Sequence, residues 1–150
     1  LDGKVAPNKG IVQVAGSAGT IQVDRLRRLA NEFEPFRALL IRHEQVLFAQ
    51  SQQSAACNAS HKVEARMCRW LLHIRDLADS DDLVLTQQFL AQMLGVTRPS
   101  VSVAASPLQK AGLIKYRRGR IRLLNVAGLK KGACECYGTV KAHYQRLLSD

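Results

Sequence analysis

Residues 85–125 read LTQQFLAQMLGVTRPSVSVAASPLQKAGLIKYRRGRIRLLN. Thr86 is placed to cap a short helix at residues 87–93, because its side-chain oxygen can accept a hydrogen bond from a free backbone N–H of the first turn. Gly95 ends this helix, since a residue without a Cβ lets the chain turn sharply. Thr97 is placed to cap a second helix two residues later. A short helix, a glycine turn and a second helix are typical of a helix-turn-helix.

A basic hairpin follows the second helix. Leu113 and Ile114 begin a predicted strand, Arg118 and Gly119 form a tight turn, and a second strand runs on to residue 124. A helix-turn-helix followed at once by a basic hairpin is a winged helix. The chain is therefore predicted to be mainly α-helical with a small β wing.

Pro107 does not fit the second helix, which we expect at about residues 97–111. A proline in the interior of a helix costs about 3 kcal/mol or more, because it removes a backbone hydrogen bond and its ring clashes with the preceding turn. Either the helix kinks at Pro107, or it ends near Ser106 and restarts.

The positive charge of the chain is concentrated in this region. The net charge is +10, which favours a polyanionic partner, with nucleic acid ahead of an anionic membrane surface. Residues 83–134 contain no Asp or Glu. The basic side chains of the same stretch are Arg98, Lys110, Lys115, Arg117, Arg118, Arg120, Arg122, Lys130 and Lys131. The alternative is that this basic stretch is only a solvated surface without a partner. A stretch of this length without any acidic residue argues against that alternative.

The first 20 residues are predicted to be the remnant of another domain. Residues 11–16, IVQVAG, alternate apolar and polar side chains and so indicate a strand. One strand is not stable alone, so it pairs with a partner chain or is the last strand of a sheet whose other strands are missing. We favour the second interpretation, because the first residue is not Met and the chain is expected to be a fragment of a longer protein.

Residues 21–58 are predicted to form a short helix capped by Asp24 and a long helix at about residues 36–57. Along the long helix, side chains recur at alternating spacings of four and three, as in a heptad seam. This predicted dimerisation seam consists of Phe36, Leu40, His43, Leu47, Gln50, Ser54 and Cys57. The alternative is an ordinary core helix.

Residues 59–150 complete the chain with the predicted winged-helix domain. Its first helix is expected at about residues 61–78 with Ser60 as its cap. The buried stripe of that helix is Val63, Met67, Trp70, Leu71 and Ile74. Its charged side chains, Glu64, Arg66, Arg69 and Arg75, are expected to face outward.

The cysteines are expected to be free thiols. No apolar stretch is long enough to span a bilayer, and residues 1–20 lack a secretory signal, so a cytoplasmic location without a membrane partner is expected. Cys134 and Cys136 lack the two-residue spacer usual in zinc knuckles, and neither a His-x-His pair nor a second cysteine pair matches them. We therefore expect no metal and no cofactor. The cysteines are interpreted as small buried residues on a helix, and His61 as a surface residue.

The sequence resembles the Crp/Fnr family of bacterial transcription regulators. The runs CNASHKVEARMCRWLL and LTQQFLAQMLGVTRPSVSVAASPLQKAGLIKYRRGRI carry the resemblance, together with the long helix before them and the IVQVAG strand, which looks like the end of the family's N-terminal β-roll sensor. The resemblance implies a homodimer that binds a near-palindromic site on double-stranded DNA, and it allows a contact with RNA polymerase.

The second helix of a helix-turn-helix fits the major groove, where its first residues reach base edges. Arg98 can make a bidentate contact with guanine, short hydroxyls suit phosphate oxygens, and the arginines of the wing suit flanking phosphates. By position, the resemblance assigns a base contact to Arg98 and phosphate contacts to Thr86 and Ser100. The full set of predicted DNA-binding residues is Thr86, Gln87, Thr97, Arg98, Pro99, Ser100, Ser102, Val103, Lys110, Arg117, Arg118 and Arg120.

Two departures from the family limit what the resemblance implies. Pro99 stands where many members have Glu, and Val103 stands where they have a further arginine, so the familiar family operator is not assumed. The effector pocket of the β-roll would precede residue 1, so no effector site is expected in this chain. The alternative function is a winged-helix module that binds RNA or protein without specific DNA binding. An enzyme is not expected, because no phosphate loop, nucleophile with a nearby base, or pair of cleft carboxylates is evident.

Overall fold

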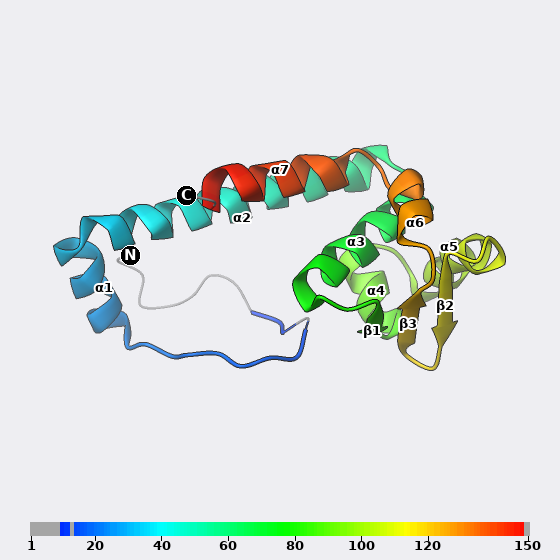
Figure 1. Ribbon diagram of the computed structural model, residues 1–150, viewed down its shortest axis with the longest axis horizontal. Coiled ribbons are helices and arrows are strands. Elements are labelled where there is room, and N and C mark those ends of the chain that lie inside the picture. The colour runs from blue at the N-terminus through cyan, green and yellow to red at the C-terminus, as the bar shows by residue number, and fades with distance from the viewer. Residues whose placement is uncertain (1–9, 13, 149–150) are drawn as a thin grey trace.

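The computed structural model describes residues 10–12 and 14–148. These residues form helices and one small antiparallel sheet, as predicted (Figure 1). The elements are, in chain order, α1 (Val23–Glu32), α2 (Glu34–Ser60), α3 (Val63–Ala78), β1 (Asp82–Val84), α4 (Gln87–Leu94), α5 (Arg98–Lys110), β2 (Ile114–Arg117), β3 (Arg120–Leu123), α6 (Val126–Gly132) and α7 (Cys136–Leu148). None of the helices in the described ranges is both long and apolar enough to cross a membrane.

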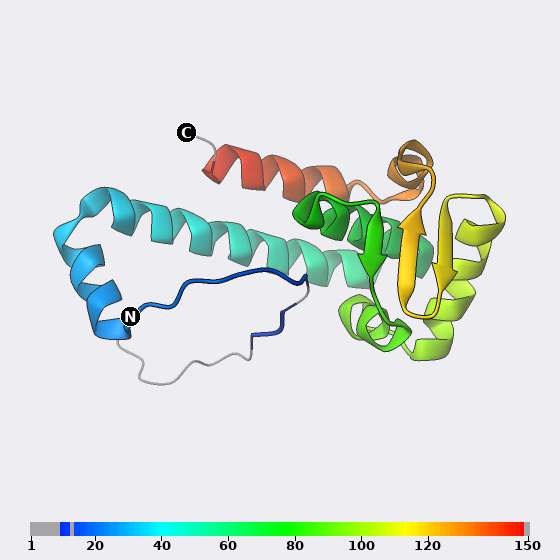
Figure 2. The ribbon, with the colours of Figure 1, turned by 60° about the horizontal axis from the view of Figure 1, so that its bottom comes forward.

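The long helix α2 projects from the winged-helix domain. Its C-terminal half is covered by α7, which returns along it, whereas its N-terminal half extends away and ends at α1 (Figures 1 and 2). Pro35 lies in the first turn of α2, where its missing N–H breaks no helical hydrogen bond. The N-terminal half of α2 is left with exposed apolar side chains: Leu39, Ile41, Leu47 and Phe48.

The predicted dimerisation seam therefore divides into two parts. Phe36, Leu40 and Leu47 belong to the projecting half of α2, and Leu47 is 44 % exposed. Gln50 instead lies next to α3, where its Nε2 is 3.2 Å from Nε2 of His73. The seam beyond Leu47 thus contacts the chain's own helices and leaves the first part open to a partner.

The main core lies between α3, α4, α5 and one face of the sheet. Its fully buried side chains include Leu71, Leu90, Leu94, Val101 and Ile121. The helical spacing of apolar residues in α3 and the alternation in β3, where Ile121 and Leu123 are buried and Arg120 and Arg122 exposed, generate this core.

The prediction that Arg66 and Arg69 face outward is wrong, since both are buried. The guanidinium of Arg66 donates hydrogen bonds to the backbone oxygens of Asn58 and Leu94, near the C-terminal ends of α2 and α4. Helix ends carry free carbonyls that need donors, so Arg66 joins two helix ends to α3. Arg69 packs near Trp70, with its Cζ 5.8 Å from the ring centroid. Lys62, not Ser60, is the N-cap of α3, because α2 continues to Ser60.

The sheet contains a strand that the sequence analysis missed. β1 pairs antiparallel with β3, which gives the strand order β1-β3-β2 (Figure 2). In this register Asp82 lies opposite Arg122, and the carboxylate accepts hydrogen bonds from Nε at 2.6 Å and from Nη2 at 2.9 Å. Asp82 is thus part of a cross-strand ion pair.

Helix α5 continues through Pro107 to Lys110, which excludes the second of the two alternatives, an end near Ser106. Proline removes the N–H that would bond to the oxygen of Val103, four residues earlier. Both Val103 and Pro107 lie on the exposed side of α5, where solvent can reach the freed carbonyl. The cost of the proline is reduced there, and the helix is not interrupted.

The strand predicted at residues 11–16 is also not formed. Residues 10–12 and 14–22 have neither helix nor strand, and Gln13 lies outside the described residues. Within the described ranges no strand pairs with this segment, and an extended segment without backbone partners is not stable as a strand. Val14 nevertheless packs against the main core.

Candidate nucleic-acid interface

The helix-turn-helix forms as predicted, from local signals. The side chain of Thr86 caps α4 by accepting a hydrogen bond from the backbone N–H of Phe89 at 3.1 Å. Gly95 adopts φ 61°, a left-handed conformation that suits glycine, and ends α4. Ala91 is buried and small, which allows α5 to approach α4 closely. These features fix the orientation of the first turn of α5.

The first turns of α5 present most of the predicted contact residues to solvent. Thr97, Arg98, Pro99, Ser102 and Val103 are exposed, whereas Ser100 is half-buried. Val101, Ala104 and Ala105 hold the opposite face of α5 in the core. The exposed face is therefore available along two turns, with one charged side chain among short polar and apolar ones.

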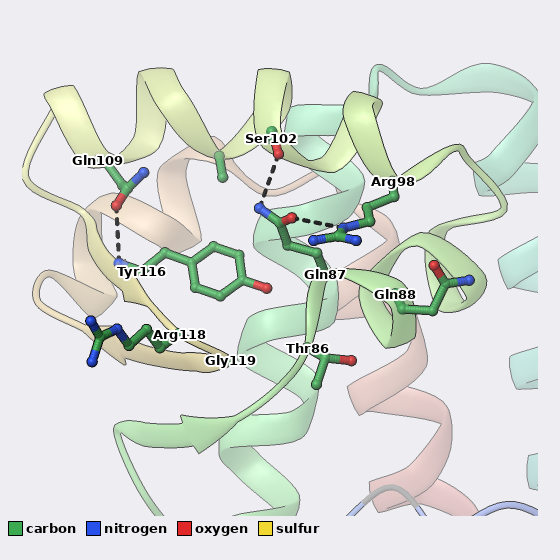
Figure 3. A pocket seen from close by; sticks show the side chains of 10 residues that line it. Thr86, Gln87, Gln88, Arg98, Ser102, Gln109, Tyr116, Arg118 and Gly119 are labelled. Atoms are coloured by element: carbon green, nitrogen blue, oxygen red, sulfur yellow. Dashed lines mark hydrogen bonds between the residues drawn. The ribbon is translucent and has the colours of Figure 1, made fainter.

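A chain of hydrogen bonds orients Arg98 (Figure 3). The Nε of Arg98 donates to Oε1 of Gln87 at 3.2 Å, and Nε2 of Gln87 donates to Oγ of Ser102 at 2.9 Å. Gln87 thus links α4 to α5 through two residues predicted to contact DNA. The two Nη atoms of Arg98 make no hydrogen bond to any residue that the structure describes, so this edge of the guanidinium is free to bind a ligand.

Several predicted hydroxyls already have partners within the chain. Oγ1 of Thr97 and Oγ of Ser100 are 2.9 Å apart. Thr86 accepts the capping bond described above and remains exposed. A hydroxyl that accepts one hydrogen bond can still donate its own proton. The capping bond of Thr86 therefore leaves its hydroxyl able to donate to an anion.

The wing is a tight hairpin with a basic tip. Arg118 and Gly119 have φ values of 47° and 76°, as a type I′ turn requires. Arg117, Arg118 and Arg120 are exposed, as predicted. The N–H of Leu85 donates to the oxygen of Gly119 at 2.9 Å, which holds the hairpin tip next to the start of α4.

The helix-turn-helix and the wing enclose a polar cleft of about 640 Å³ (Figure 3). It is lined by Thr86, Gln87, Gln88, Arg98, Ser102, Ala105, Gln109, Tyr116, Arg118 and Gly119. The five predicted DNA-binding residues that line this cleft are Thr86, Gln87, Arg98, Ser102 and Arg118. Lys110, at the last turn of α5, and Arg117 and Arg120, on the strands of the wing, are not among the lining residues.

The sequence analysis missed Gln88, Gln109 and Tyr116. The backbone N–H of Tyr116 donates to Oε1 of Gln109 at 3.0 Å, and its hydroxyl donates to the oxygen of Leu85 at 3.2 Å. Burial raises the pKa of the Tyr116 phenol, so it remains a neutral donor. The alternation along β2, which turns Tyr116 to the same side as buried Ile114, was the available signal.

The interface is positively charged without internal compensation. Of the nine basic side chains between residues 83 and 134, Arg122 is the one that forms an ion pair within the described ranges, with Asp82. Those near the cleft, Arg98 and Arg118, have no carboxylate partner there. Uncompensated cations beside an exposed helix face favour an anionic partner.

Comparison with protein families identifies a domain that contains this interface. Residues 65–131 match the family described as the Crp-like helix-turn-helix domain. The match covers α3, the helix-turn-helix and the wing, and it ends within α6. No curated protein sequence matches the chain significantly.

Solved structures share the fold. A Crp/Fnr-family transcriptional regulator from Eubacterium rectale aligns with a TM-score of 0.58 at 18 % identity, over 73 % of this chain and 50 % of its own. A CRP-family transcriptional regulator from Thermus thermophilus aligns with a TM-score of 0.55 at 24 % identity, over 75 % of this chain and 55 % of its own. The chain thus spans about half the length of these proteins.

Proposed function

We propose that this chain, whose residues 65–131 match the Crp-like helix-turn-helix domain, is a transcription regulator of the Crp/Fnr family. In this proposal it binds a near-palindromic operator on double-stranded DNA as a dimer. Helix α5 enters the major groove, and the wing lies along the flanking backbone. The observation that carries the proposal is the exposed first half of α5, oriented by the Arg98–Gln87–Ser102 hydrogen bonds beside a basic wing.

Six of the predicted residues have distinct roles in this arrangement. Arg98 reads guanine through its free Nη atoms, and Val103, which is 69 % exposed, offers an apolar contact to a thymine methyl group. Gln87 positions Arg98 instead of reading a base itself. Arg117, Arg118 and Arg120 neutralise phosphates, which makes the affinity fall with salt.

The experiment is a selection of binding sites by the full 150-residue chain, from a random double-stranded DNA pool, at two salt concentrations. The proposal predicts a palindromic motif whose half-sites are about one helical turn, 10–10.5 base pairs, apart. The selected site should be bound at least tenfold more tightly than a scrambled duplex of the same composition. Salt-sensitive binding without a motif would overturn the specific readout, and tighter binding to RNA than to any duplex would support the alternative module.

A further inference from the structure

Outside the helix-turn-helix, three cysteines and a histidine converge on one point. Cys57 lies in the last turn of α2 and His61 is the C-cap of that helix. Cys134 lies between α6 and α7, and Cys136 is the first residue of α7. The three thiol sulfurs and a ring nitrogen of His61 all lie within 4.8 Å of one another. We call these four residues the thiol–imidazole cluster.

We propose that the thiol–imidazole cluster is a structural binding site for one Zn²⁺ ion. Its residues lie on either side of the domain matched at 65–131 and not within it, so the site is an addition to the helix-turn-helix. The proposal does not depend on DNA binding.

The distances fit a single tetrahedral ion. With Zn–S bonds of about 2.3 Å and Zn–N bonds of about 2.0–2.1 Å, the edges of the tetrahedron are about 3.8 Å between two sulfurs and about 3.6 Å between sulfur and nitrogen. Sγ of Cys57 is 3.5 Å from Sγ of Cys134, and Sγ of Cys136 is 3.6 Å from Nδ1 of His61. A cluster of several irons would need its ligands further apart. Three thiolates and one imidazole form a donor set typical of structural zinc.

The groups around the four ligands have the arrangement that metal ligands need. Nδ1 of His61 points toward the cluster, while its Nε2 is 3.1 Å from Oε1 of Glu135. A carboxylate on the second ring nitrogen fixes the tautomer and orientation of a metal-binding histidine. Nε2 of Gln53 donates to Sγ of Cys136 at 3.0 Å, as an amide does to a thiolate.

The burial of the cluster favours a closed site. Cys57 and Cys136 are 0 % and 1 % exposed, and Cys134 is buried as well. The alternative is that these thiols only pack as small apolar residues. That alternative explains the burial of the sulfurs but not the orientation of His61 by Glu135, which lies between two of the ligands in sequence.

The ion would join the two parts of the molecule. Its ligands come from the end of α2, from the segment between α6 and α7, and from the first residue of α7, the helix that covers the second half of α2. Each thiol that binds the metal releases its proton to solvent. The bound ion therefore holds the projecting helix at a fixed position relative to the winged-helix domain.

The test is metal binding by the purified 150-residue chain under anaerobic, reducing conditions. We expect one zinc per chain by elemental analysis. We also expect Co²⁺ added to the metal-free chain to give the intense visible and thiolate-to-metal absorption of a tetrahedral thiolate site. Cys57→Ser and Cys136→Ser should lose the absorption, whereas Cys68→Ala, which removes a buried thiol of α3 outside the cluster, should retain it. Glu135→Gln should keep the spectrum but weaken Zn²⁺ binding about 10–100-fold.

A measurement on the unaltered chain does not depend on whether the variants fold. The melting temperature of this chain should rise when Zn²⁺ is added to its metal-free form. A wild-type chain that binds neither metal stoichiometrically would overturn the proposal. So would Co²⁺ spectra that are the same in the Cys57→Ser and wild-type chains. A Cys57–Cys134 disulfide in the freshly purified, metal-free protein would assign the cluster to redox chemistry instead.

Discussion

Gln87 accepts a hydrogen bond from Nε of Arg98 at 3.2 Å and so fixes the one charged side chain on the exposed first turn of α5. The bond joins the first residue of α4 to the first residue of α5. The orientation of the proposed base-reading group is thus set before DNA arrives, which lowers the entropy lost on binding.

Replacing Arg98 should reduce specificity more than general affinity. Arg98→Ala should weaken binding to the selected operator by about 1–3 kcal/mol, because a bidentate contact to guanine is lost. Binding to a scrambled duplex should change much less. Fluorescence anisotropy with both duplexes measures the two losses, and equal losses would show that Arg98 contacts only the backbone.

Replacing Gln87 should act through Arg98. Gln87→Ala removes both hydrogen bonds that join α4 to α5 at this point, so the guanidinium is no longer oriented. We expect a smaller loss of operator affinity than for Arg98→Ala, and little further loss when the two changes are combined. A double-mutant cycle measures this coupling. Fully additive losses would mean that Gln87 contacts DNA independently.

The arginine at the tip of the wing should contribute to affinity for any duplex. Arg118→Asn is the suitable change, because Asn tolerates the positive φ of 47° at this position. The variant should bind operator and scrambled duplex more weakly by a similar factor, and its log K against log salt slope should fall by about one. Arg146→Ala, on α7, is the matched control and should leave the slope unchanged. A loss confined to the operator would indicate base contact by the wing.

The helix-turn-helix was predictable because its signals are local. Thr86 and Gly95 mark the two ends of α4 and Thr97 marks the start of α5, and the structure places the helices there. The basic hairpin was equally local, with its turn at Arg118 and Gly119. Helix caps and tight turns depend on a few neighbouring residues, so a single sequence shows them.

The features that were missed depend on residues far apart in the chain. Strand β1 has only three residues and is stabilised by pairing with β3, which lies about forty positions later. Arg66 is buried because carbonyls at two helix ends need its donors, and those ends meet only in the tertiary fold. The thiol–imidazole cluster escaped notice for the same reason, since the spacing of Cys134 and Cys136 was judged without the end of α2 beside them.

The ion pair between Asp82 and Arg122 should make stability depend on pH in the acidic range. The hydrogen bonds from Arg122 hold the pKa of Asp82 below its ordinary value of 3.8. The pair therefore stabilises the fold above that value, and its contribution is lost as the pH falls through the lowered pKa. Asp82→Asn should lower the melting temperature slightly at pH 7, and the difference from wild type should shrink below about pH 4.

Thermal unfolding followed by circular dichroism at several pH values measures this difference. Asp79→Asn is the control, because Asp79 has no ion pair among the described residues and Asn tolerates its φ of 47°. A melting difference for Asp82→Asn that stays constant down to pH 2 would show that the effect does not come from the charge of the carboxylate.

The buried side of α3 should carry much of the stability of the domain. Leu71 is fully buried in the core, whereas Leu77 on the same helix is 57 % exposed. Leu71→Ala should reduce the free energy of unfolding by about 2–5 kcal/mol, because it leaves a cavity. Leu77→Ala should change it by about 0.5 kcal/mol or less. Urea unfolding measures both, and similar losses for the two variants would contradict the position of α3 in the core.

The projecting half of α2 should form the dimer contact. Leu47 lies on the predicted seam, and the chain's own helices leave it exposed, together with Leu39, Ile41 and Phe48. Leu47→Asp would place a carboxylate in an apolar interface, where an unpaired charge is strongly unfavourable. We expect this variant to sediment as a monomer at concentrations at which the wild type is a dimer.

The same change should weaken binding to the full palindrome far more than to a single half-site, because two linked contacts bind more tightly than one. Gln52→Asp introduces the same charge on an exposed part of α2 away from the seam and should leave the dimer intact. Analytical ultracentrifugation of the wild type, Leu47→Asp and Gln52→Asp measures the oligomeric state of each. A wild-type chain that is monomeric even on operator DNA would overturn the dimer, and a dimeric Leu47→Asp chain would move the contact elsewhere on the molecule.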